Sequence, residues 1–363
     1  MSTNYPKKCW YVAAKTDEVK NEPLSRNLLG TPVVLWRGID GLVNAFENRC
    51  AHRGFPFTDS RIVDGHLVCN YHGCTYDAAG NCVYTPAQLQ VPSGMSVRSF
   101  PVIEDGPFLW IWPGNPAAAT QSPPTAPWAK KSHWTTFYDT WKVDANYMML
   151  HEHYLDFSYA PVLHANDLPP GLSSMGSFND VEVTETTVSY TRVLPELPLA
   201  DWQAEATGLD PSSSYKHVEG GTFVSPAIHS QYWKIENAAG DAFITTRSHC
   251  LTPESESSTH VFMQSSRNYA SSDDAVTAGL RRFLDRVAER DKSILEMTSR
   301  HSGYDGWRSG VEFQTDAAAL RARRIVGVLL AKEAGRAEIR PGLAPNSRGE
   351  YALSPHLSAS LGE

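Results

Sequence analysis

The sequence has no long apolar runs and no excess of positive charge. No stretch approaches the roughly eighteen consecutive apolar residues that a membrane-spanning helix needs, and residues 1–8 lack the apolar core of a signal peptide. The 32 Lys and Arg are outnumbered by 40 Asp and Glu, which gives a formal charge of -8. We therefore expect a cytoplasmic protein that binds neither a membrane nor nucleic acid.

Cysteine is also scarce, with 6 residues in a chain of 363. In a chain without an export signal, a reducing compartment disfavours structural disulfides. Four of the cysteines nevertheless lie close together in the sequence, with histidines between them. These four are Cys50, Cys69, Cys74 and Cys82. Such clustering favours a metal centre over a disulfide framework.

The length of the chain is typical of about two domains, and its 41% of hydrophobic residues can form a sizeable core. In residues 1–116, short apolar runs alternate with Asp-Gly and Arg-Gly turn signals, which predicts an antiparallel β-domain. A segment rich in Ala, Ser, Thr and Pro, 117–127, is the predicted linker. Residues 128–340 form the second predicted domain, and residues 341–363 are typical of a loose tail.

The second domain mixes strand and helix patterns. Helices are predicted over residues 145–156, 275–300 and 316–333, the last two from apolar residues at helical spacing and from an Ala, Arg and Leu-rich composition. Alternating strands are predicted between the first helix and the second. The predicted fold class is therefore α+β: an N-terminal antiparallel β-domain, then an α+β domain with a central antiparallel sheet and C-terminal helices.

Two matched Cys and His pairs carry the strongest motif. Cys50-Ala51-His52 is followed, after sixteen residues, by Cys69-Asn70-Tyr71-His72. This is the spacing of a Rieske [2Fe–2S] centre, in which two thiolates hold one iron and two imidazoles hold the other. A Cys2His2 zinc site is the alternative, but zinc ligands usually come as two Cys followed by two His, whereas here they alternate. Cys74 and Cys82 are then surplus and are expected to be packed thiols.

The residues 49–54 and 69–73 resemble the Rieske domain of the Rieske non-haem iron oxygenases, and the resemblance extends to about Glu333. Within that superfamily the chain most resembles the vanillate and dicamba O-demethylase type. One departure is Cys74, where members usually carry Trp. Respiratory Rieske electron carriers, the rival class, have an extra Cys in each loop, and here those places hold Phe55 and Tyr71.

The resemblance implies a mononuclear iron(II) held by two His and one carboxylate. The matching run, residues 146–164, has His164 at the second His position, but Tyr159 stands at the first, and His153 replaces the usual Asn. Three readings stay open: His153 is a relocated ligand, Tyr159 ligates iron as a phenolate, or the site is impaired. Relocation requires a helix break, because an unbroken helix would separate His153 from His164 by about 16 Å. Pro161 predicts that break just before His164.

Two carboxylates complete the set that the resemblance implies. Asp291 continues the apolar stripe of its predicted helix, so it is expected on the buried face, where a charge needs a partner or a metal. It also matches the aspartate ligand of the family, the alternative being an ion pair with an arginine. Asp156 matches the aspartate that connects a Rieske His of one subunit to the iron site of its neighbour, and it would act by hydrogen bonding to an imidazole. The alternative is a helix-surface Asp.

The implied protein is the terminal oxygenase of a multicomponent monooxygenase, resembling homotrimeric relatives. It would use dioxygen to hydroxylate or O-/N-demethylate a small aromatic or heterocyclic substrate. The sequence has no Gly-x-Gly-x-x-Gly signature, so electrons should come from NAD(P)H through a separate reductase or ferredoxin. The alternative is an electron-transfer protein or a homologue with an impaired iron site. Strand positions give five candidate pocket residues: Phe223, His229, Trp233, His249 and Met263.

Overall fold

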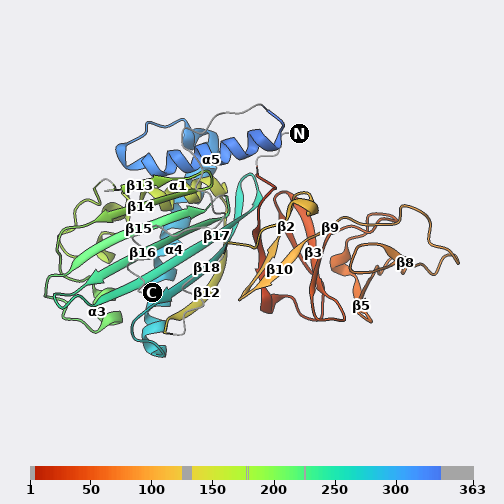
Figure 1. The fold of residues 1–363 in the computed structure, drawn as a ribbon, viewed down its shortest axis with the longest axis horizontal. Coiled ribbons are helices and arrows are strands. Elements are labelled where there is room, and N and C mark those ends of the chain that lie inside the picture. Colours follow the sequence, from red (N-terminus) through yellow and green to blue (C-terminus); the bar gives the residue numbers. More distant parts are fainter. Residues whose placement is uncertain (1–4, 125–132, 177, 179, 225, 337–363) are drawn as a thin grey trace. The chain divides into compact units, whose positions relative to one another are not determined.

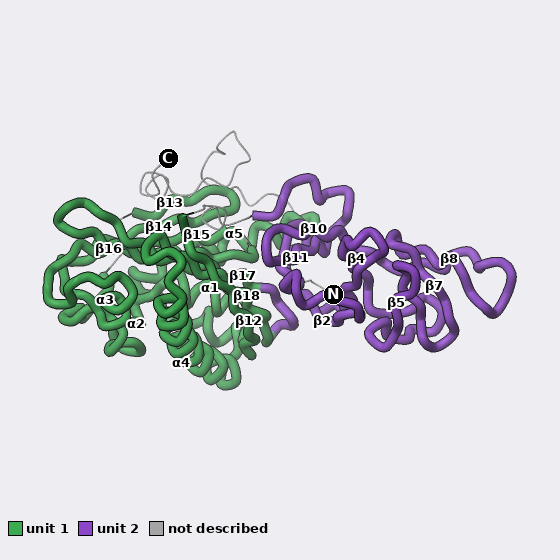
Figure 2. The backbone as a smooth tube through the Cα atoms, turned by 90° about the horizontal axis from the view of Figure 1, so that it is seen from below, with its two compact units in different colours: residues 1–3, 126–251, 257–363 green, residues 4–125, 252–256 purple. Residues whose placement is uncertain are grey.

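The computed structural model describes residues 5–124, 133–176, 178, 180–224 and 226–336. The chain forms two compact units (Figure 2). One consists of Asn4–Thr125 with Thr252–Glu256, and the other mainly of Ala126–Leu251 and Ser257–Glu363. No helix in the described part of the chain is long and apolar enough to cross a membrane.

Three small antiparallel sheets make up the N-terminal unit. The first has the strand order β1 (Tyr11–Lys15), β11 (Phe108–Ile111), β10 (Val102–Asp105). The second has the order β2 (Leu24–Leu28), β3 (Thr31–Arg37), β4 (Val43–Glu47), β9 (Ser99–Phe100). The third has the order β5 (Arg61–Val63), β6 (His66–Val68), β7 (Thr75–Tyr76), β8 (Cys82–Tyr84). These sheets confirm the predicted antiparallel β-domain.

The turn between β5 and β6 shows why an Asp-Gly pair was needed there. Gly65 has a φ of +72°, and a Cβ on it would lie 2.4 Å from the backbone nitrogen of Ile39. Only glycine fits both the left-handed conformation and the close approach. The resulting hairpin brings the two Cys and His loops to neighbouring ends of the third sheet, since one loop precedes β5 and the other joins β6 to β7.

A seven-stranded antiparallel sheet forms the centre of the second unit (Figure 1). Its strand order is β12 (Thr135–Val143), β18 (Ser258–Arg267), β17 (Ala242–Ser255), β16 (Ile228–Glu236), β15 (Lys216–Val224), β14 (Thr187–Val193), β13 (Asp180–Val183). The helices are α1 (Tyr147–Asp156), α2 (Ala160–Leu163), α3 (Asp201–Thr207), α4 (Asp274–Arg308) and α5 (Ala317–Glu333). The α+β class with a central sheet and C-terminal helices is therefore confirmed.

The helices begin and end where local chemistry dictates. The side chain of Asn146 accepts a hydrogen bond from the backbone of Met148 and caps α1, which ends where Phe157 adopts a left-handed φ of 52°. Helix α4 runs past its predicted end to Arg308, with a non-helical residue at Gly303. Helix α4 packs on β12 and α1, and α5 packs on α1 and β14.

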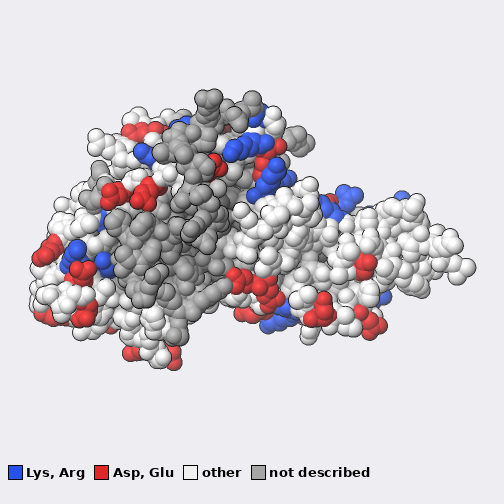
Figure 3. Space-filling model, viewed as in Figure 1, with Lys and Arg blue, Asp and Glu red and all other residues white. Residues whose placement is uncertain are grey.

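The predicted linker and tail reach into residues that the structure does not describe. Of the linker, 125–127 lie outside the described residues, and so does the whole tail, 341–363. A short 3-10 helix, Pro116–Ala118, begins at the predicted end of the first domain. On the face drawn in Figure 3, the acidic and basic side chains of the described residues are interspersed, with no broad basic surface among them.

Candidate metal centres

The two Cys and His loops have the same backbone hydrogen bonds. In residues 50–55, the N–H of Cys50 donates to the carbonyl of Phe55 (2.8 Å) and the N–H of Gly54 donates to the carbonyl of Cys50 (2.9 Å). The same two bonds recur at equivalent positions in residues 69–74, each at 2.9 Å. Gly54 and Gly73 both have a φ of +71°. Each of the two loops therefore presents one Cys and one His.

The structure brings the four predicted cluster residues together. The rings of His52 and His72 have centroids 4.4 Å apart, and both are exposed. Cys50 and Cys69 are buried. Burial raises the pKa of the Cys69 thiol and the adjacent Cys50 raises it further, while hydrogen bonds from the backbone N–H groups of Tyr71 and His72 oppose the rise. Amides aimed at a sulfur are suited to a thiolate.

Tyr76 is a residue of this centre that sequence reasoning missed. Its hydroxyl lies 3.2 Å from the sulfur of Cys50 and accepts a hydrogen bond from the N–H of Ala51 at 3.1 Å. Burial raises the pKa of Tyr76 well above its usual value, so the phenol stays protonated and can donate to the sulfur. An aromatic residue in a strand is ordinary, so the sequence held no signal for this contact.

The two surplus cysteines are free and buried beside this centre. Burial raises the pKa of Cys74 to about 11, and the neighbouring Cys50 and Cys82 raise it as well. Burial also raises the pKa of Cys82. Both are therefore neutral thiols near pH 7, packed in the same core cluster as Cys50 and Cys69.

The second candidate centre depends on the end of helix α1. The predicted helix break occurs: α1 ends where Phe157 turns left-handed, and the short helix α2 ends just before His164. Pro161 is instead accommodated in the first turn of α2, where no backbone N–H is required for helical hydrogen bonding. His164 follows α2 directly, and the reversal brings it back toward His153 in the last turn of α1.

Two histidines and one carboxylate meet at this second place. The Oδ1 atom of Asp291 lies 2.7 Å from Nε2 of His164 and 3.3 Å from Nε2 of His153. All three side chains are buried. Burial alone would raise the pKa of Asp291, but the charge of His153 and the hydrogen bond and charge of His164 hold it well below its usual range. The site therefore contains an ionised carboxylate between two imidazoles.

The alternative partner for Asp291, an arginine, is ruled out by its contacts. On the same helix, Arg286 and Arg290 pair with Asp167, at 2.7 and 2.8 Å. Within the described residues, the ion pairs of Asp291 are those with His153 and His164. The buried carboxylate is thus free of competing cationic side chains.

Tyr159, the other candidate first ligand, lies against His153. Its ring is stacked on that imidazole, with centroids 3.9 Å apart. Its buried hydroxyl has no hydrogen-bond partner among the described residues. Burial, followed by the charge of Asp291, raises its pKa well above 10.0. The phenol is therefore neutral here, and ligation as a phenolate would require it to lose its proton.

At the second place, the donor atoms of His153, His164 and Asp291 contact one another. Among the described residues, no three His, Cys, Asp or Glu side chains stand in ready-made coordination geometry. His164 and Asp291 contact each other through Nε2 and Oδ1, the atoms that would bind a metal. Nε2 of His153 is buried without a hydrogen-bond partner among the described residues. Two imidazoles and a carboxylate are a donor set that fits iron(II).

Asp156 is half-buried at the end of α1. Its Oδ2 accepts a hydrogen bond from Ser158 at 2.7 Å, while its Oδ1 is buried without a partner. It lines a groove that also borders His153 and Tyr159. Exposed apolar side chains lie along this groove, among them Val311 (90% exposed) and Phe313 (73%).

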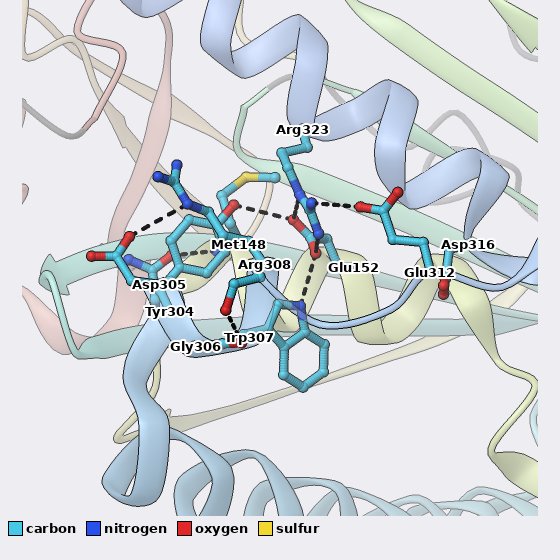
Figure 4. Close-up of polar contacts among 12 residues, drawn as sticks. Met148, Glu152, Tyr304, Asp305, Gly306, Trp307, Arg308, Glu312, Asp316 and Arg323 are labelled. Atoms are coloured by element: carbon cyan, nitrogen blue, oxygen red, sulfur yellow. Dashed lines mark hydrogen bonds and ion pairs between the residues drawn. The ribbon is translucent and has the colours of Figure 1, made fainter.

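A network centred on Glu152 fixes the helices around His153 (Figure 4). The buried carboxylate accepts hydrogen bonds from Tyr304 (3.1 Å), Trp307 (2.8 Å) and, through two nitrogens, Arg323 (2.9 and 2.6 Å). Through these residues, α1 is bonded to the end of α4 and, at Arg323, to α5. The sequence did not predict this role of Glu152, because its partners Tyr304, Trp307 and Arg323 are remote from it in the chain.

A cavity reaches His164. Its walls are largely apolar and aromatic, formed by Trp202, Trp233, Phe283, Leu284 and Val287, and its polar lining includes Glu219, Gln231 and Arg247. Of the five candidate pocket residues, only Trp233 lines this cavity. His229 and His249 stack with Tyr154, Phe223 packs on His151, and Met263 lies in another core cluster.

Comparisons with known proteins agree with this architecture. Residues 9–101 match the model of the Rieske [2Fe-2S] domain, and residues 143–332 match the vanillate O-demethylase oxygenase C-terminal domain. The chain is 30% identical over 354 residues to the oxygenase component of dicamba O-demethylase from Stenotrophomonas maltophilia, covering 91% of this chain and 99% of the relative. It is 25% identical to a vanillate O-demethylase oxygenase subunit from Pseudomonas, covering 91% and 96%.

A solved structure of dicamba monooxygenase bound to dicamba superposes with a TM-score of 0.81 at 28% identity, covering 92% of this chain and 99% of the other. The chain therefore belongs to the Rieske non-haem iron oxygenases, as an oxygenase component of the vanillate and dicamba O-demethylase type. It is an oxidoreductase, and its Rieske domain implies a [2Fe–2S] cluster. The family predicted from the two motifs is confirmed.

Proposed function

We propose that this protein is the terminal oxygenase of a multicomponent monooxygenase that hydroxylates or O-/N-demethylates a small aromatic or heterocyclic substrate. The observation that carries this proposal is the meeting of His153, His164 and Asp291 at one end of an aromatic cavity, which His164 also lines. Iron(II) bound by these residues would supply dioxygen activation. The aromatic walls would hold the substrate ring, exclude water and orient the reacting group toward His164.

Cys50, His52, Cys69 and His72 would hold the [2Fe–2S] cluster, the two thiolates on the buried side and the two imidazoles at the surface. Tyr76 would donate a hydrogen bond to the Cys50 sulfur and so stabilise its negative charge. Exposed imidazoles suit a centre that must exchange single electrons with a partner. Electrons would come from NAD(P)H through a separate reductase or ferredoxin.

At the mononuclear site, His153 would take the place of the missing first histidine. Its Nε2 already approaches Asp291, and imidazole is a better donor to iron(II) than a buried neutral phenol. Tyr159 would then act as a ring that fixes the orientation of His153 by stacking. The second candidate function, an oxygenase homologue with an impaired iron site, is favoured by one observation, that the unpartnered phenol of Tyr159 occupies the family's first ligand position.

Asp156 would connect the two kinds of centre between copies of the chain in a homotrimer. Its unpartnered Oδ1 can accept a hydrogen bond from an exposed imidazole such as His72 of a second copy, and the groove beside it offers apolar side chains for that contact. Such a carboxylate holds the imidazole proton and aligns the electron path toward His153. The groove therefore supports assembly in which the site of one copy is completed by the Rieske domain of another.

Metal content and turnover test this proposal. Purified protein should hold three irons and two acid-labile sulfides per chain, and His164→Ala should hold two irons with an unchanged cluster spectrum. With a surrogate reductase and NADH, methoxylated aromatics should give dioxygen-dependent product and, where demethylated, formaldehyde. Two irons in the wild type, together with no turnover of any tested aromatic, would favour the impaired-site reading.

A further inference from the structure

Glu219 occupies an unusual place in the wall of the cavity. It lies on β15, directly opposite Arg192 on β14 and Trp233 on β16, and it is 2% exposed. Residues two apart along a strand share a face, so Gln231 and Arg247, which are paired on β16 and β17, lie on the same side of the sheet as Glu219. All three line the cavity next to His164.

Among the described residues, none donates a hydrogen bond to the carboxylate of Glu219. Both of its oxygens are buried without a hydrogen-bond partner, and its ion pair to Nη1 of Arg192 is 3.5 Å long. Glu152 in the same unit is equally buried but accepts four hydrogen bonds, as Figure 4 shows. Buried acceptors are rarely left unpaired, because an acceptor taken out of water without a new donor is destabilising.

The surroundings of Glu219 favour a ligand group as the missing donor. Burial raises the pKa of Glu219 to about 7, against the lowering effect of Arg192 and Arg247, so a donor in the cavity would relieve a strongly desolvated carboxylate. Gln231 presents a second acceptor there, because its Oε1 is buried without a partner while its Nε2 donates to the carbonyl of Tyr154. The remaining walls are mostly apolar, and the unpartnered donor among the described side chains that line them is Nε2 of Gln203.

We propose that Glu219 is a specificity-determining residue that accepts a hydrogen bond from an O–H or N–H group on the substrate ring. The cavity then selects phenols, anilines or N–H heterocycles over analogues in which that group is replaced by an alkyl group. This inference rests on the proposed function only in taking the cavity as the substrate site. A hydrogen bond to a charged group corresponds to a preference of about tenfold or more.

Binding to the holoprotein without dioxygen tests the inference independently of turnover. The ligands are 3-methoxyphenol, 3-methoxyaniline and 3-methoxytoluene, which differ at one ring position, and the signal is quenching of the tryptophans Trp202 and Trp233 that line the cavity. The wild type should bind the phenol and the aniline at least about tenfold more tightly than the toluene. Glu219→Gln should lose most of that preference. Glu236→Gln, the same change on an adjacent strand where Lys234 pairs with the carboxylate, should keep it.

Equal binding of the three ligands by the wild type would overturn the inference, and so would failure of the phenol and the aniline to bind at millimolar concentration. The ligand comparison in the wild type needs no variant, so it holds even if Glu219→Gln does not fold. The two proposals fail separately. A missing third iron with a retained ligand preference would contradict the proposed function alone. Turnover of methoxyarenes without the preference would contradict the inference about Glu219 alone.

Discussion

The phenol ring of Tyr159 lies stacked on the imidazole of His153, with ring centroids 3.9 Å apart and planes inclined by 16°. The two candidate first ligands thus occupy neighbouring places beside Asp291. Of these two residues, His153 directs a nitrogen at the carboxylate of Asp291, at 3.3 Å. The hydroxyl of Tyr159 has no hydrogen-bond partner among the described residues. This arrangement makes the choice of ligand testable one residue at a time.

His153→Ala should remove the mononuclear iron and leave the Rieske cluster intact, because it deletes an imidazole beside Asp291 but touches neither Cys loop. Tyr159→Phe should keep the iron and most of the activity, since it keeps the stacked ring. Iron per chain and the visible spectrum measure both effects. Phenolate ligation predicts the reverse, together with a charge-transfer band in the ferric protein that Tyr159→Phe abolishes.

The double change His153→Asn with Tyr159→His is the control for this pair, because it restores the arrangement that the family resemblance implies. It should bind iron where His153→Asn alone does not. If His153→Ala and Tyr159→Phe both kept a full third iron, neither residue would be an essential ligand, and relocation would be wrong.

Patterns that are local in sequence predicted most of this molecule. The β-domain followed from apolar runs broken by Asp-Gly turns, and the buried position of Asp291 followed from its place on a helical stripe. The break of α1 was predicted because His153 and His164 could not share one ion across an unbroken helix. The end of α1 at Phe157 was not predicted, since nothing in the sequence marks Phe157 as the residue that turns left-handed.

The cavity could not be predicted in the same way. Its aromatic walls come from α3, β16 and α4, which are remote in sequence, so Trp202 and Phe283 meet only in the fold, with ring centroids 4.4 Å apart. His229 and Trp233 lie on one face of β16 because they are four residues apart on the strand. This alternation could not show that the end with His229 is filled by Tyr154 while the end with Trp233 is open.

Cys50→Ser should bleach the Rieske cluster, whereas Cys74→Ser should leave the visible spectrum largely intact. Cys74 is a neutral buried thiol whose pKa is raised to about 11, and serine preserves its size. The Cys74→Ser change should lower the free energy of unfolding by about 1 kcal/mol, because it buries a hydroxyl. Loss of the spectrum in Cys74→Ser would contradict the assignment of Cys50, His52, Cys69 and His72 as the ligands.

If the carboxylate couples the centres of two subunits, Asp156→Asn should preserve both metal centres and substrate affinity but slow turnover about 10- to 100-fold. The amide keeps the shape and can still bond Ser158, so folding should be unchanged. Iron content, cluster reduction by dithionite and single-turnover product from pre-reduced protein measure these effects. Product formation equal to that of the wild type would show that Asp156 has no bridging role.

Glu219 should make the stability of the protein depend on pH in a defined window. Burial raises its pKa from 4.5 to about 7, while Arg192 and Arg247 lower it and Asp156 raises it. A carboxyl whose pKa is raised on folding holds its proton more tightly in the folded state, so its contribution to stability is lost as pH rises from about 4.5 to about 7. The loss is at most about 3 kcal/mol, from 1.36 kcal/mol per unit.

Glu219→Gln removes this titration, so the melting temperature of the variant should rise relative to that of the wild type as pH increases from 5 to about 8. Glu236→Gln is the matched control with the opposite sign. Hydrogen bonds and charges from Lys234 hold the pKa of Glu236 below its usual value against the effect of burial, so its contribution is lost only as pH falls below about 4.5. Parallel melting curves for wild type and Glu219→Gln across this range would mean that Glu219 is not protonated near neutral pH.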